Sequence, residues 1–517
     1  MRTSVRNVVR FAVIAFTVGS AVAAQVTFDR LRHAADEPHN WLTYSGTYFS
    51  QRFSTLTQIT TENVRQLQLQ WVYQAQSAEP SDSKFEATPL VVDGVMYTVR
   101  PPNDVVALDA TTGQVRWTKA YAPAAAARTC CGRVNRGLAV VDDMLFMGTI
   151  DGRLLAMSAA DGRIVWNVPI GRPEAGYSIT HAPLVVHDTV IVGPAGGEFG
   201  IRGFLAAFDV KTGNERWRFY TVPGPGEFGA DSWSGDSWKT GGGPIWMTGS
   251  YDAETNLTYW AVGNPAPPYN GDSRTGDNLF TNSVVALDAS TGKLKWHFQF
   301  TAHDELDLDT AQPPVLADLL WQGKPRKLML WGNKNGNFYV LDRTTGELLL
   351  KKAYGSSTNW WPPSFSPATG LFYIPAGNLS NQPNIIKEQA TYVEGERFMG
   401  GRPQPAGQRA GQPPVDERPG PTQRGGRGVI AIVPATGESA WQFNASVRGM
   451  LATASHVLFI ADVDGYFRAL DARTGRELWK ILLGRFNFMS PMTYAVDGRQ
   501  YVSITVGNGL FTFALPQ

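Results

Sequence analysis

The stretch ALDATTGQVRW, from Ala107 to Trp117, contains the pattern that decides the fold. A short apolar run reaches Asp109, and two residues later a Thr-Gly pair is followed by polar residues and a Trp. This order indicates a β-strand, a tight turn in which Gly113 takes a positive φ, and a second strand. Trp117 is expected to dock on a neighbouring unit, because an indole buries a large apolar area. One such hairpin cannot bury its faces alone, so the pattern predicts repeated units.

About seven copies occur along the chain, at irregular periods of roughly 40 to 90 residues, which is the period of propeller blades or above it. A closed ring of such units leaves no long sheet edge exposed, whereas a linear array leaves two. We therefore predict an all-β fold, a β-propeller with Trp-docking motifs. The remaining copies are Ala156 to Trp166, Ala207 to Trp217, Ala286 to Trp296, Val340 to Leu350, Ala431 to Trp441 and Ala469 to Trp479.

The two ends of the chain supply one further blade. LQLQWVYQ, Leu67 to Gln74, resembles the Trp-bearing strand of the repeat but lacks the preceding turn. The C-terminal segment Ser490 to Leu515 contains the strands that this unit needs, and a blade shared by both ends locks a ring shut. The expected count is eight blades, with seven as the alternative.

We expect a single propeller domain over residues 24–517, interrupted by an insertion at about 381–428. The insertion is rich in Pro, Gly, Arg and Gln and poor in apolar residues, which predicts a loop rather than a domain. Both a lid and a solvated surface insertion fit this composition. Pro223 to Gly243 is a second candidate for a loop near one face of the ring.

The first residues predict export. Arg2, Arg6 and Arg10 precede an apolar run from Phe11 to Val22, which is the pattern of a secretory signal peptide over residues 1–23. Roughly a dozen apolar residues are too few to span a bilayer, so cleavage is favoured over a membrane anchor. The expected location is the periplasm, with no stable membrane insertion after cleavage.

The composition and net charge of the chain limit its fold class and its possible binding partners. The chain has 53 Gly, 33 Pro and 16 Trp, which suits many short strands joined by tight turns. Its formal net charge is +1 with 18% charged residues. The chain therefore lacks the basic field that nucleic acid binding requires.

Cys130 and Cys131 are adjacent and are the only two cysteines. In an oxidising compartment they can form a vicinal disulfide, although adjacent Cα atoms at about 3.8 Å are closer than in ordinary disulfides. Such a ring is a rigid platform, and the alternative is a pair of reduced, buried cysteines. Nearby, Arg136 offers a fork that suits a carboxylate or quinone oxygen, or a surface ion pair.

Glu198 and Asn264 offer oxygen ligands for a cation. Glu198 lies in GGEFGIRG, Gly196 to Gly203, where little side-chain bulk crowds its carboxylate. Asn264 directly precedes Pro265, which restricts its backbone. A carboxylate with an amide oxygen is a hard ligand set that suits Ca²⁺ or a larger cation.

Four acids fall within HDELDLD, from His303 to Asp309. Alternation along an extended chain places Glu305, Asp307 and Asp309 on one side. Packed like charges raise one another's pKa unless a cation offsets them. The motif therefore favours a metal site, with a solvated acidic turn as the alternative.

Taken together, these motifs make the chain similar to the PQQ-dependent methanol and ethanol dehydrogenase family of quinoproteins, over nearly all of the sequence after the predicted signal. Besides the repeats, NWLTYSGTYFSQRFSTLTQITTENV (Asn40 to Val64) resembles the family's N-terminal signature. The resemblance implies an eight-bladed propeller that sandwiches pyrroloquinoline quinone (PQQ) between a Cys130–Cys131 disulfide and Trp246.

The resemblance also implies roles for individual residues. Asp307 is the implied catalytic base. Asp309 matches an extra acid of lanthanide-using members, and an additional anionic ligand suits a trivalent ion, so a lanthanide is favoured over Ca²⁺. The implied metal ligands are Glu198, Asn264, Asp307 and Asp309. The implied PQQ contacts are Glu86, Cys130, Cys131, Arg136, Thr180, Gly196, Gly197, Trp246, Lys334, Asn359 and Trp360.

Two positions depart from the family's pattern. Ala195 stands where many relatives have a Ser that contacts PQQ, which puts one hydrogen bond in doubt. Pro268 stands where methanol-specific relatives have a Trp that lines the pocket. Methanol is therefore not the expected default substrate.

The implied function is oxidation of a small alcohol to an aldehyde, with Asp307 taking the hydroxyl proton and hydride passing to PQQ. No Cys-x-x-Cys-His haem motif occurs in the chain, so an external acceptor, a soluble cytochrome c, is implied. A quinoprotein sugar or polyol dehydrogenase and a non-catalytic propeller scaffold stay open as alternatives. The oligomeric state, monomer or homodimer, also stays open.

Overall fold

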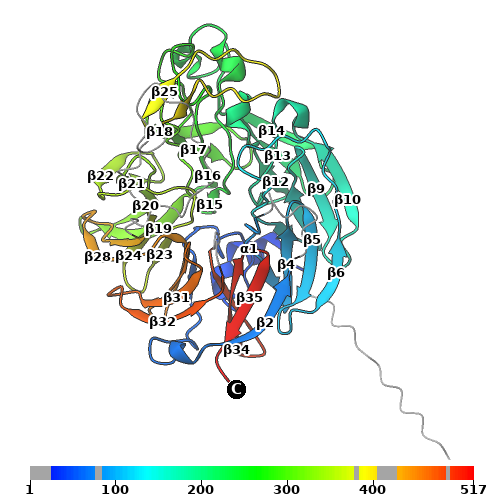
Figure 1. Cartoon of the computed structure of the whole chain (residues 1–517), viewed down its shortest axis with the longest axis vertical. Helices are drawn as coiled ribbons and strands as arrows, with labels where there is room; N and C mark the ends of the chain where they lie inside the picture. Colours follow the sequence, from blue (N-terminus) through cyan, green and yellow to red (C-terminus); the bar gives the residue numbers. More distant parts are fainter. Residues whose placement is uncertain (1–24, 76–83, 378–383, 405–427, 485–489) are drawn as a thin grey trace, which may run out of the picture.

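Eight antiparallel sheets, arranged in a ring, form the blades of a propeller (Figure 1). The structure is a computed structural model and describes residues 25–75, 84–377, 384–404, 428–484 and 490–517. Seven of the blades have four strands, and one has a fifth. The prediction of an eight-bladed, all-β propeller is confirmed, and the seven-bladed alternative is wrong.

The first four blades follow the chain in order. Blade 1 consists of β3 (Leu90–Val92), β4 (Val95–Arg100), β5 (Asp104–Asp109) and β6 (Val115–Lys119); blade 2 of β7 (Ala139–Val141), β8 (Met144–Gly148), β9 (Arg153–Ser158) and β10 (Ile164–Pro169). Blade 3 consists of β11 (Leu184–Val186), β12 (Thr189–Val192), β13 (Phe204–Asp209) and β14 (Glu215–Tyr220); blade 4 of β15 (Ser250–Asp252), β16 (Leu257–Ala261), β17 (Ser283–Asp288) and β18 (Leu294–Gln299).

The next three blades continue the ring. Blade 5 consists of β19 (Val315–Trp321), β20 (Lys324–Gly332), β21 (Asn337–Asp342) and β22 (Leu348–Ala353); blade 6 of β23 (Ser364–Ser366), β24 (Leu371–Ala376), β27 (Gly428–Ile432) and β28 (Ser439–Phe443). Blade 7 consists of β29 (Val447–Thr453), β30 (Val457–Asp462), β31 (Tyr466–Asp471) and β32 (Glu477–Leu482), and β1 (Phe53–Ser54) pairs with β29 in parallel.

Blade 8 joins the two ends of the chain, as predicted. The N-terminal strand β2 (Gln68–Gln74) pairs antiparallel with the C-terminal strand β35 (Gly509–Ala514). Two more C-terminal strands, β33 (Met492–Val496) and β34 (Arg499–Val506), complete this sheet. The ring is therefore closed by hydrogen bonds between segments that lie more than four hundred residues apart in the sequence.

Each repeat forms the turn between the two outer strands of a blade. In blade 1 the Asp109 carboxylate accepts the Thr112 N–H at 3.0 Å, and its carbonyl accepts the Gly113 N–H at 2.8 Å. Gly113 has φ +72°, and a Cβ there would lie 2.6 Å from the Trp71 ring of the neighbouring blade. The same ring-on-glycine contact joins Trp117 to Gly162, Trp166 to Gly213, Trp217 to Gly292, Trp296 to Gly346 and Trp441 to Gly475. The predicted docking of the Trp residues is confirmed.

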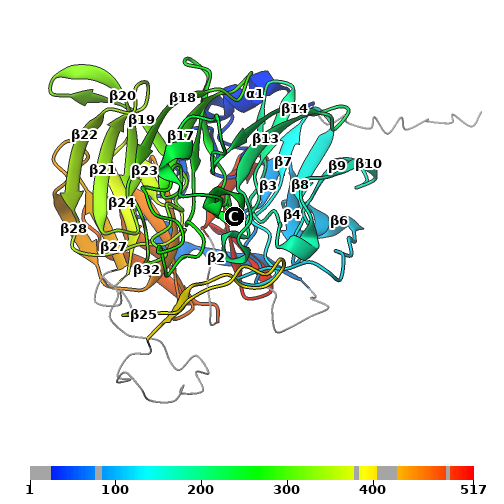
Figure 2. The ribbon, with the colours of Figure 1, turned by 90° about the horizontal axis from the view of Figure 1, so that it is seen from above.

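The segments outside the blades lie on the two faces of the ring. The N-terminal helix α1 (Phe28–Arg32) lies on one side, and a two-stranded sheet of β25 (Ile385–Lys387) and β26 (Gly401–Pro403) lies on the other (Figure 2). The 3₁₀ helices are η1 (Ala34–Asp36), η2 (Val64–Gln66), η3 (Pro173–Ala175), η4 (Gly197–Phe199), η5 (Ala230–Ser232) and η6 (Ser237–Thr240).

The structure describes part of the predicted insertion and none of the predicted signal peptide. Of the insertion, residues 384–404 are described and contain β25 and β26, while the signal peptide at 1–23 lies outside the described residues. Among the residues that are described, no helix combines the length and hydrophobicity needed to cross a membrane.

Gly292 and Gly370 provide a matched test of the docking contact. Both have a positive φ, +67° and +69°, so alanine strains either backbone by ~1 kcal/mol. A Cβ at Gly292 lies 2.4 Å from the Trp217 ring, whereas nothing lies within 4 Å of a Cβ at Gly370. We expect Gly292→Ala to lower the free energy of unfolding by a further ~1–3 kcal/mol, because it overpacks this contact. Thermal unfolding of both variants measures this, and equal midpoints would contradict it.

Candidate active site

A cavity of about 300 Å³ lies where the loops of successive blades converge. Its walls come from the loops before blades 1 to 6, from turns within blades 3 and 5, and from the first strand of blade 7. Of the predicted site residues, all except Gly197 and Asn264 line this cavity. Those two lie beside each other, since a Cβ on Gly197 would be 2.8 Å from Asn264 Oδ1. Gly197 stands between the lining residues Gly196 and Glu198. The structure thus gathers the predicted residues in one place.

One wall is a buried ion pair under aromatic rings. Arg136 Nη2 lies 2.9 Å from Glu86 Oε2, and both side chains are buried. The Arg136 guanidinium also lies over the rings of Trp360 and Trp246, 4.5 and 5.3 Å from their centroids. Its backbone N–H donates to the Thr180 carbonyl at 2.9 Å. Cation–π and ionic contacts hold this guanidinium in place.

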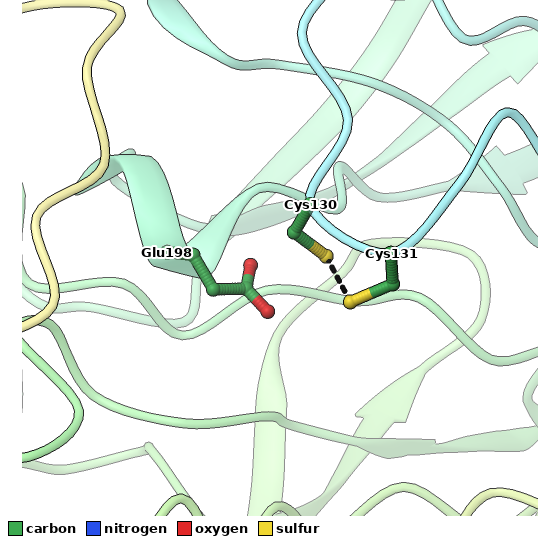
Figure 3. A group of neighbouring side chains, drawn as sticks. All are labelled: Cys130, Cys131 and Glu198. Atoms are coloured by element: carbon green, nitrogen blue, oxygen red, sulfur yellow. Dashed lines mark hydrogen bonds between the residues drawn. The ribbon is translucent and has the colours of Figure 1, made fainter. Parts of the chain in front are cut away.

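A second wall carries the two cysteines and Glu198. Glu198 stands on η4 and points toward the sulfurs of Cys130 and Cys131 (Figure 3). The ligand atoms of these three residues lie within 4.8 Å of one another. The cysteines are free in this structure, with Sγ atoms 2.6 Å apart, so the predicted disulfide is not formed here. Burial, reinforced by the charge of Asp309, raises the pKa of Glu198.

A third wall holds the acids Asp307 and Asp309 around Lys334. Lys334 Nζ lies 3.7 Å from Asp307 Oδ2 and 3.4 Å from Asp309 Oδ2, and it donates to the Asp307 carbonyl. Burial raises the pKa of Asp307 well above its usual value, an effect that Lys334 opposes. Asp307 Oδ1 is buried without a hydrogen-bond partner in the described part of the chain. Asp307 also has φ +57°, an unfavourable backbone conformation that often marks functional residues.

The predicted alternation of the acidic segment is wrong. The buried Asp304 carboxylate accepts the backbone N–H groups of Leu306 at 2.9 Å and Leu308 at 2.7 Å, which bends the chain. Glu305 consequently points away from Asp307 and pairs with Lys387 at 2.7 Å. Aspartate often makes such local bonds in competition with extended structure. Asp307 and Asp309 share a side as predicted, but Glu305 does not join them.

Asn264 is tied to Asp309 through its backbone. The Asn264 N–H donates to Asp309 Oδ1 at 2.9 Å, and its side-chain amide donates to the Pro265 carbonyl at 3.0 Å. This second bond directs the amide nitrogen to the backbone, which leaves Oδ1 as the atom beside Gly197. Asn264, Asp309 and the Glu198 loop are therefore contiguous.

The cavity residues that were not found from the sequence include Lys84, Trp361 and Arg448. The Arg448 guanidinium lies 4.0 Å from the centroid of the Trp361 ring, and burial lowers its pKa to about 10. Trp361 directly follows Trp360, and this TNWWPP run was a usable signal. Arg448 lies on strand β29 outside any motif. Of the two positions that depart from the family's pattern, Ala195 lines the cavity and Pro268 does not.

A buried acid beside a lysine, in a cavity of a propeller that is also lined by Trp246 and Trp360, is typical of a cofactor-binding enzyme site. A family model described as the PQQ glucose/ethanol/alcohol dehydrogenase β-propeller domain matches residues 41–351 and 444–502. Quinohemoprotein alcohol dehydrogenase ADH-IIG of Pseudomonas putida is 36% identical, over 94% of this chain and 75% of its own length.

Two further comparisons concern metal-dependent relatives. Lanthanide-dependent methanol dehydrogenase of Methylorubrum extorquens is 32% identical, over 89% of this chain and 86% of its own length. The solved structure of a europium-containing methanol dehydrogenase superposes with a TM-score of 0.84 at 29% identity, over 94% of this chain and all of that one. This chain belongs to the family of PQQ-dependent alcohol dehydrogenases, and the predicted resemblance is confirmed. It is an enzyme of that class, so the scaffold alternative is not supported.

His181, beside Thr180, makes the stability of the site dependent on pH. Its Nδ1–H donates to the Ala182 carbonyl at 2.8 Å, and Nε2 accepts the Gly193 N–H at 3.1 Å. Both bonds use the neutral ring, and burial lowers the pKa of His181 to about 4. An unfolded chain binds this proton near pH 6.5. The contribution of His181 to stability is therefore present above about pH 6.5 and is lost as pH falls toward 4.

We expect this loss to amount to ~3 kcal/mol across that pH range. His181→Gln keeps a donor and an acceptor but removes the titration. Urea unfolding at pH 7 and pH 4.5 measures the effect, and the difference in unfolding free energy between the two proteins should narrow at the lower pH. An equal difference at both pH values would show that His181 does not titrate as inferred.

Proposed function

We propose that this protein is a periplasmic dehydrogenase that oxidises an alcohol to an aldehyde, using PQQ and one bound cation. The observation that carries the proposal is the buried Asp307 carboxylate, whose Oδ1 has no hydrogen-bond partner in the described residues and whose Oδ2 faces Lys334. A general base needs an acceptor atom that no other group occupies and a nearby positive charge that favours its ionised form. The family's named activity supports the choice of an alcohol as substrate.

The cavity suits PQQ, which is a planar quinone with three carboxylates. Trp246, Cys130 and Cys131 line this cavity. We propose that Trp246 and the cysteine pair would lie on opposite faces of the flat ring, and that the pair is oxidised to a disulfide in the working enzyme. Arg136 supplies a cationic fork for anionic oxygens. Thr180 Oγ1 is buried without a partner in the described residues, so a ligand oxygen would satisfy it.

The remaining residues proposed to contact PQQ line the same cavity or lie beside it. Lys334 would lie near the quinone oxygens, and Arg448, stacked on Trp361, adds a cation on another side. When bound, PQQ supplies an electron-poor carbonyl carbon that accepts a hydride. The other contacts would be Glu86, Gly196, Gly197, Asn359 and Trp360.

The residues of this chain supply the catalytic base and hold it in position. The ionised Asp307 carboxylate takes the proton of the substrate hydroxyl, so that the carbon beneath it can lose hydride and become the aldehyde carbon. Lys334 stabilises the ionised form of Asp307 and holds its backbone through the carbonyl. Asp304, by accepting the Leu306 and Leu308 N–H groups, fixes the bend that presents Asp307. The base is thus preorganised.

We propose that the cation is a lanthanide rather than Ca²⁺, with Glu198, Asn264, Asp307 and Asp309 as ligands. All four offer hard oxygen donors. Asp309 adds a negative charge that favours a trivalent ion. The lanthanide-dependent relative is consistent with this choice.

Features of the sequence support the proposed location and electron acceptor. The signal-like segment at residues 1–23 supports export to the periplasm, and the lack of a Cys-x-x-Cys-His motif supports an external acceptor such as a soluble cytochrome c. A sugar or polyol dehydrogenase is the alternative within the same chemistry, and a substrate panel separates the two.

Asp307→Asn tests the base. The amide keeps the size of the side chain but accepts no proton, so we expect kcat to fall by roughly 10²–10⁴-fold while PQQ still binds. Activity is measured with primary alcohols and an artificial electron acceptor after reconstitution with PQQ and La³⁺ or Ca²⁺, and PQQ binding by its absorbance. Retained activity in the variant would show that Asp307 is not the base. If the unchanged protein shows no turnover under any condition, the proposed dehydrogenase activity is refuted.

Asp309→Ala tests the choice of metal. Removal of one anionic ligand lowers the affinity of the site for a trivalent ion more than for a divalent one. La³⁺-dependent activity should therefore be lost selectively. The measurement is kcat with each ion across an ion titration. Equal loss, or equal retention, with La³⁺ and Ca²⁺ would contradict the lanthanide assignment.

A further inference from the structure

The segment 384–404, here called the strap, lies against the loops of the candidate site. It consists of β25, the loop 388–400 and β26, and is the yellow segment at the end opposite α1 in Figure 2. Phe398 is buried and contacts Tyr392 at a ring separation of 5.7 Å. Both rings close on Gly200, where a Cβ would lie 3.0 Å from Tyr392. The strap is therefore held to the molecule by packing.

Two adjacent strap residues hold two different walls of the cavity. Arg397 Nη2 donates to the Cys130 carbonyl at 2.6 Å, and the Phe398 N–H donates to the Glu198 carbonyl at 2.7 Å. These are the walls whose side chains, Cys130, Cys131 and Glu198, face one another within 4.8 Å (Figure 3). The strap thus connects the backbones of two loops that approach each other in the cavity.

Other strap contacts reach the remaining ligand-bearing loops. The Met399 carbonyl accepts the N–H of Tyr269, in the loop that follows Asn264, at 3.0 Å. Lys387 Nζ pairs with Glu305, in the acidic loop, at 2.7 Å. Every loop that carries a proposed cation ligand is therefore bonded to the strap.

The loop with the two cysteines depends most on such an outside contact. Residues 120–138 form no strand, so no sheet ladder fixes the position of Cys130. Within the described ranges, Arg397 is the only group that donates to the Cys130 carbonyl. A guanidinium makes a shorter and stronger bond to an oxygen than a neutral donor does. Arg397 is the contact best suited to set where this loop lies.

We propose that Arg397 is a positioning residue: by holding Cys130 from the strap that also holds Glu198, it sets the spacing between the cysteine pair and Glu198. This inference rests on the proposed cofactor site. Arg397 does not line the cavity. It acts through the Cys130 loop, and its positive charge also opposes the rise in the pKa of Glu198 that burial causes. Its removal should leave the propeller intact, because no blade uses it.

The test compares Arg397→Ala and Arg397→Lys with Arg402→Ala. Arg402 is a matched control because it lies on β26 of the same strap but pairs with Glu388, at 3.3 Å, instead of a cavity loop. Hydrogen exchange, followed by mass spectrometry on protein without added cofactor, reports on residues 126–136. We expect Arg397→Ala to speed exchange there about fivefold, Arg397→Lys to restore part of the protection, and Arg402→Ala to match the unchanged protein.

Binding supplies the second readout. Titrations with Tb³⁺, followed by its luminescence, and with PQQ, followed by absorbance, should give dissociation constants about fivefold higher for Arg397→Ala and unchanged for Arg402→Ala. Unchanged exchange in the Cys130 loop overturns the proposal, as does faster exchange throughout the molecule, which means general destabilisation. Faster local exchange with unchanged affinities also overturns it. If the unchanged protein binds neither Tb³⁺ nor PQQ, the proposed function fails, and the exchange comparison still decides whether Arg397 holds the loop.

Discussion

The contact between a Trp ring and a glycine in the next blade is the interaction on which the rest of the structure depends. Trp217 shows both of its parts, since its ring closes on Gly292 and its Nε1–H donates to the Ala289 carbonyl at 3.1 Å. Because glycine has no side chain, the Trp ring can pack directly against the turn, and this packing sets the angle between neighbouring blades. Six of the eight blade-to-blade steps use this contact among the described residues, and the ring closes where β2 and β35 share a sheet.

Closure brings charged residues from different blades together, where they must pair. Glu86 and Arg136 come from the loops before blades 1 and 2, while Lys334 of blade 5 lies against Asp307 and Asp309. A buried charge without a partner costs several kcal/mol, whereas a paired one can be held rigidly. The same ion pairs that reduce the free-energy cost of burying these charges therefore also orient the acids of the cavity. Proton abstraction needs this preorganisation.

The directions of the acids in the acidic loop and the place of Arg448 in the cavity were not predictable from the sequence. The motif HDELDLD indicated acids at a site but not their directions, because the Asp304 carboxylate bonds to the backbone of its own loop and breaks the expected alternation. Arg448 belongs to no motif, and it meets Trp361 only because blades 6 and 7 are neighbours. Neither the Asp304 hydrogen bonds nor the Arg448–Trp361 contact produces a repeating pattern in the sequence from which it could be predicted.

By itself the sequence determined the propeller, the blade shared by both chain ends and the kinds of side chain present at the cavity, and it favoured eight blades over seven. It could do so because an Asp-Thr-Gly turn and its Trp act over about ten residues, within the range of local geometry. Only the tertiary structure decided which side chains face each other, such as Lys334 with Asp309 or Arg397 with Cys130. Those contacts join loops and the strap, whose relative positions depend on how the blades and loops pack and not on the local sequence.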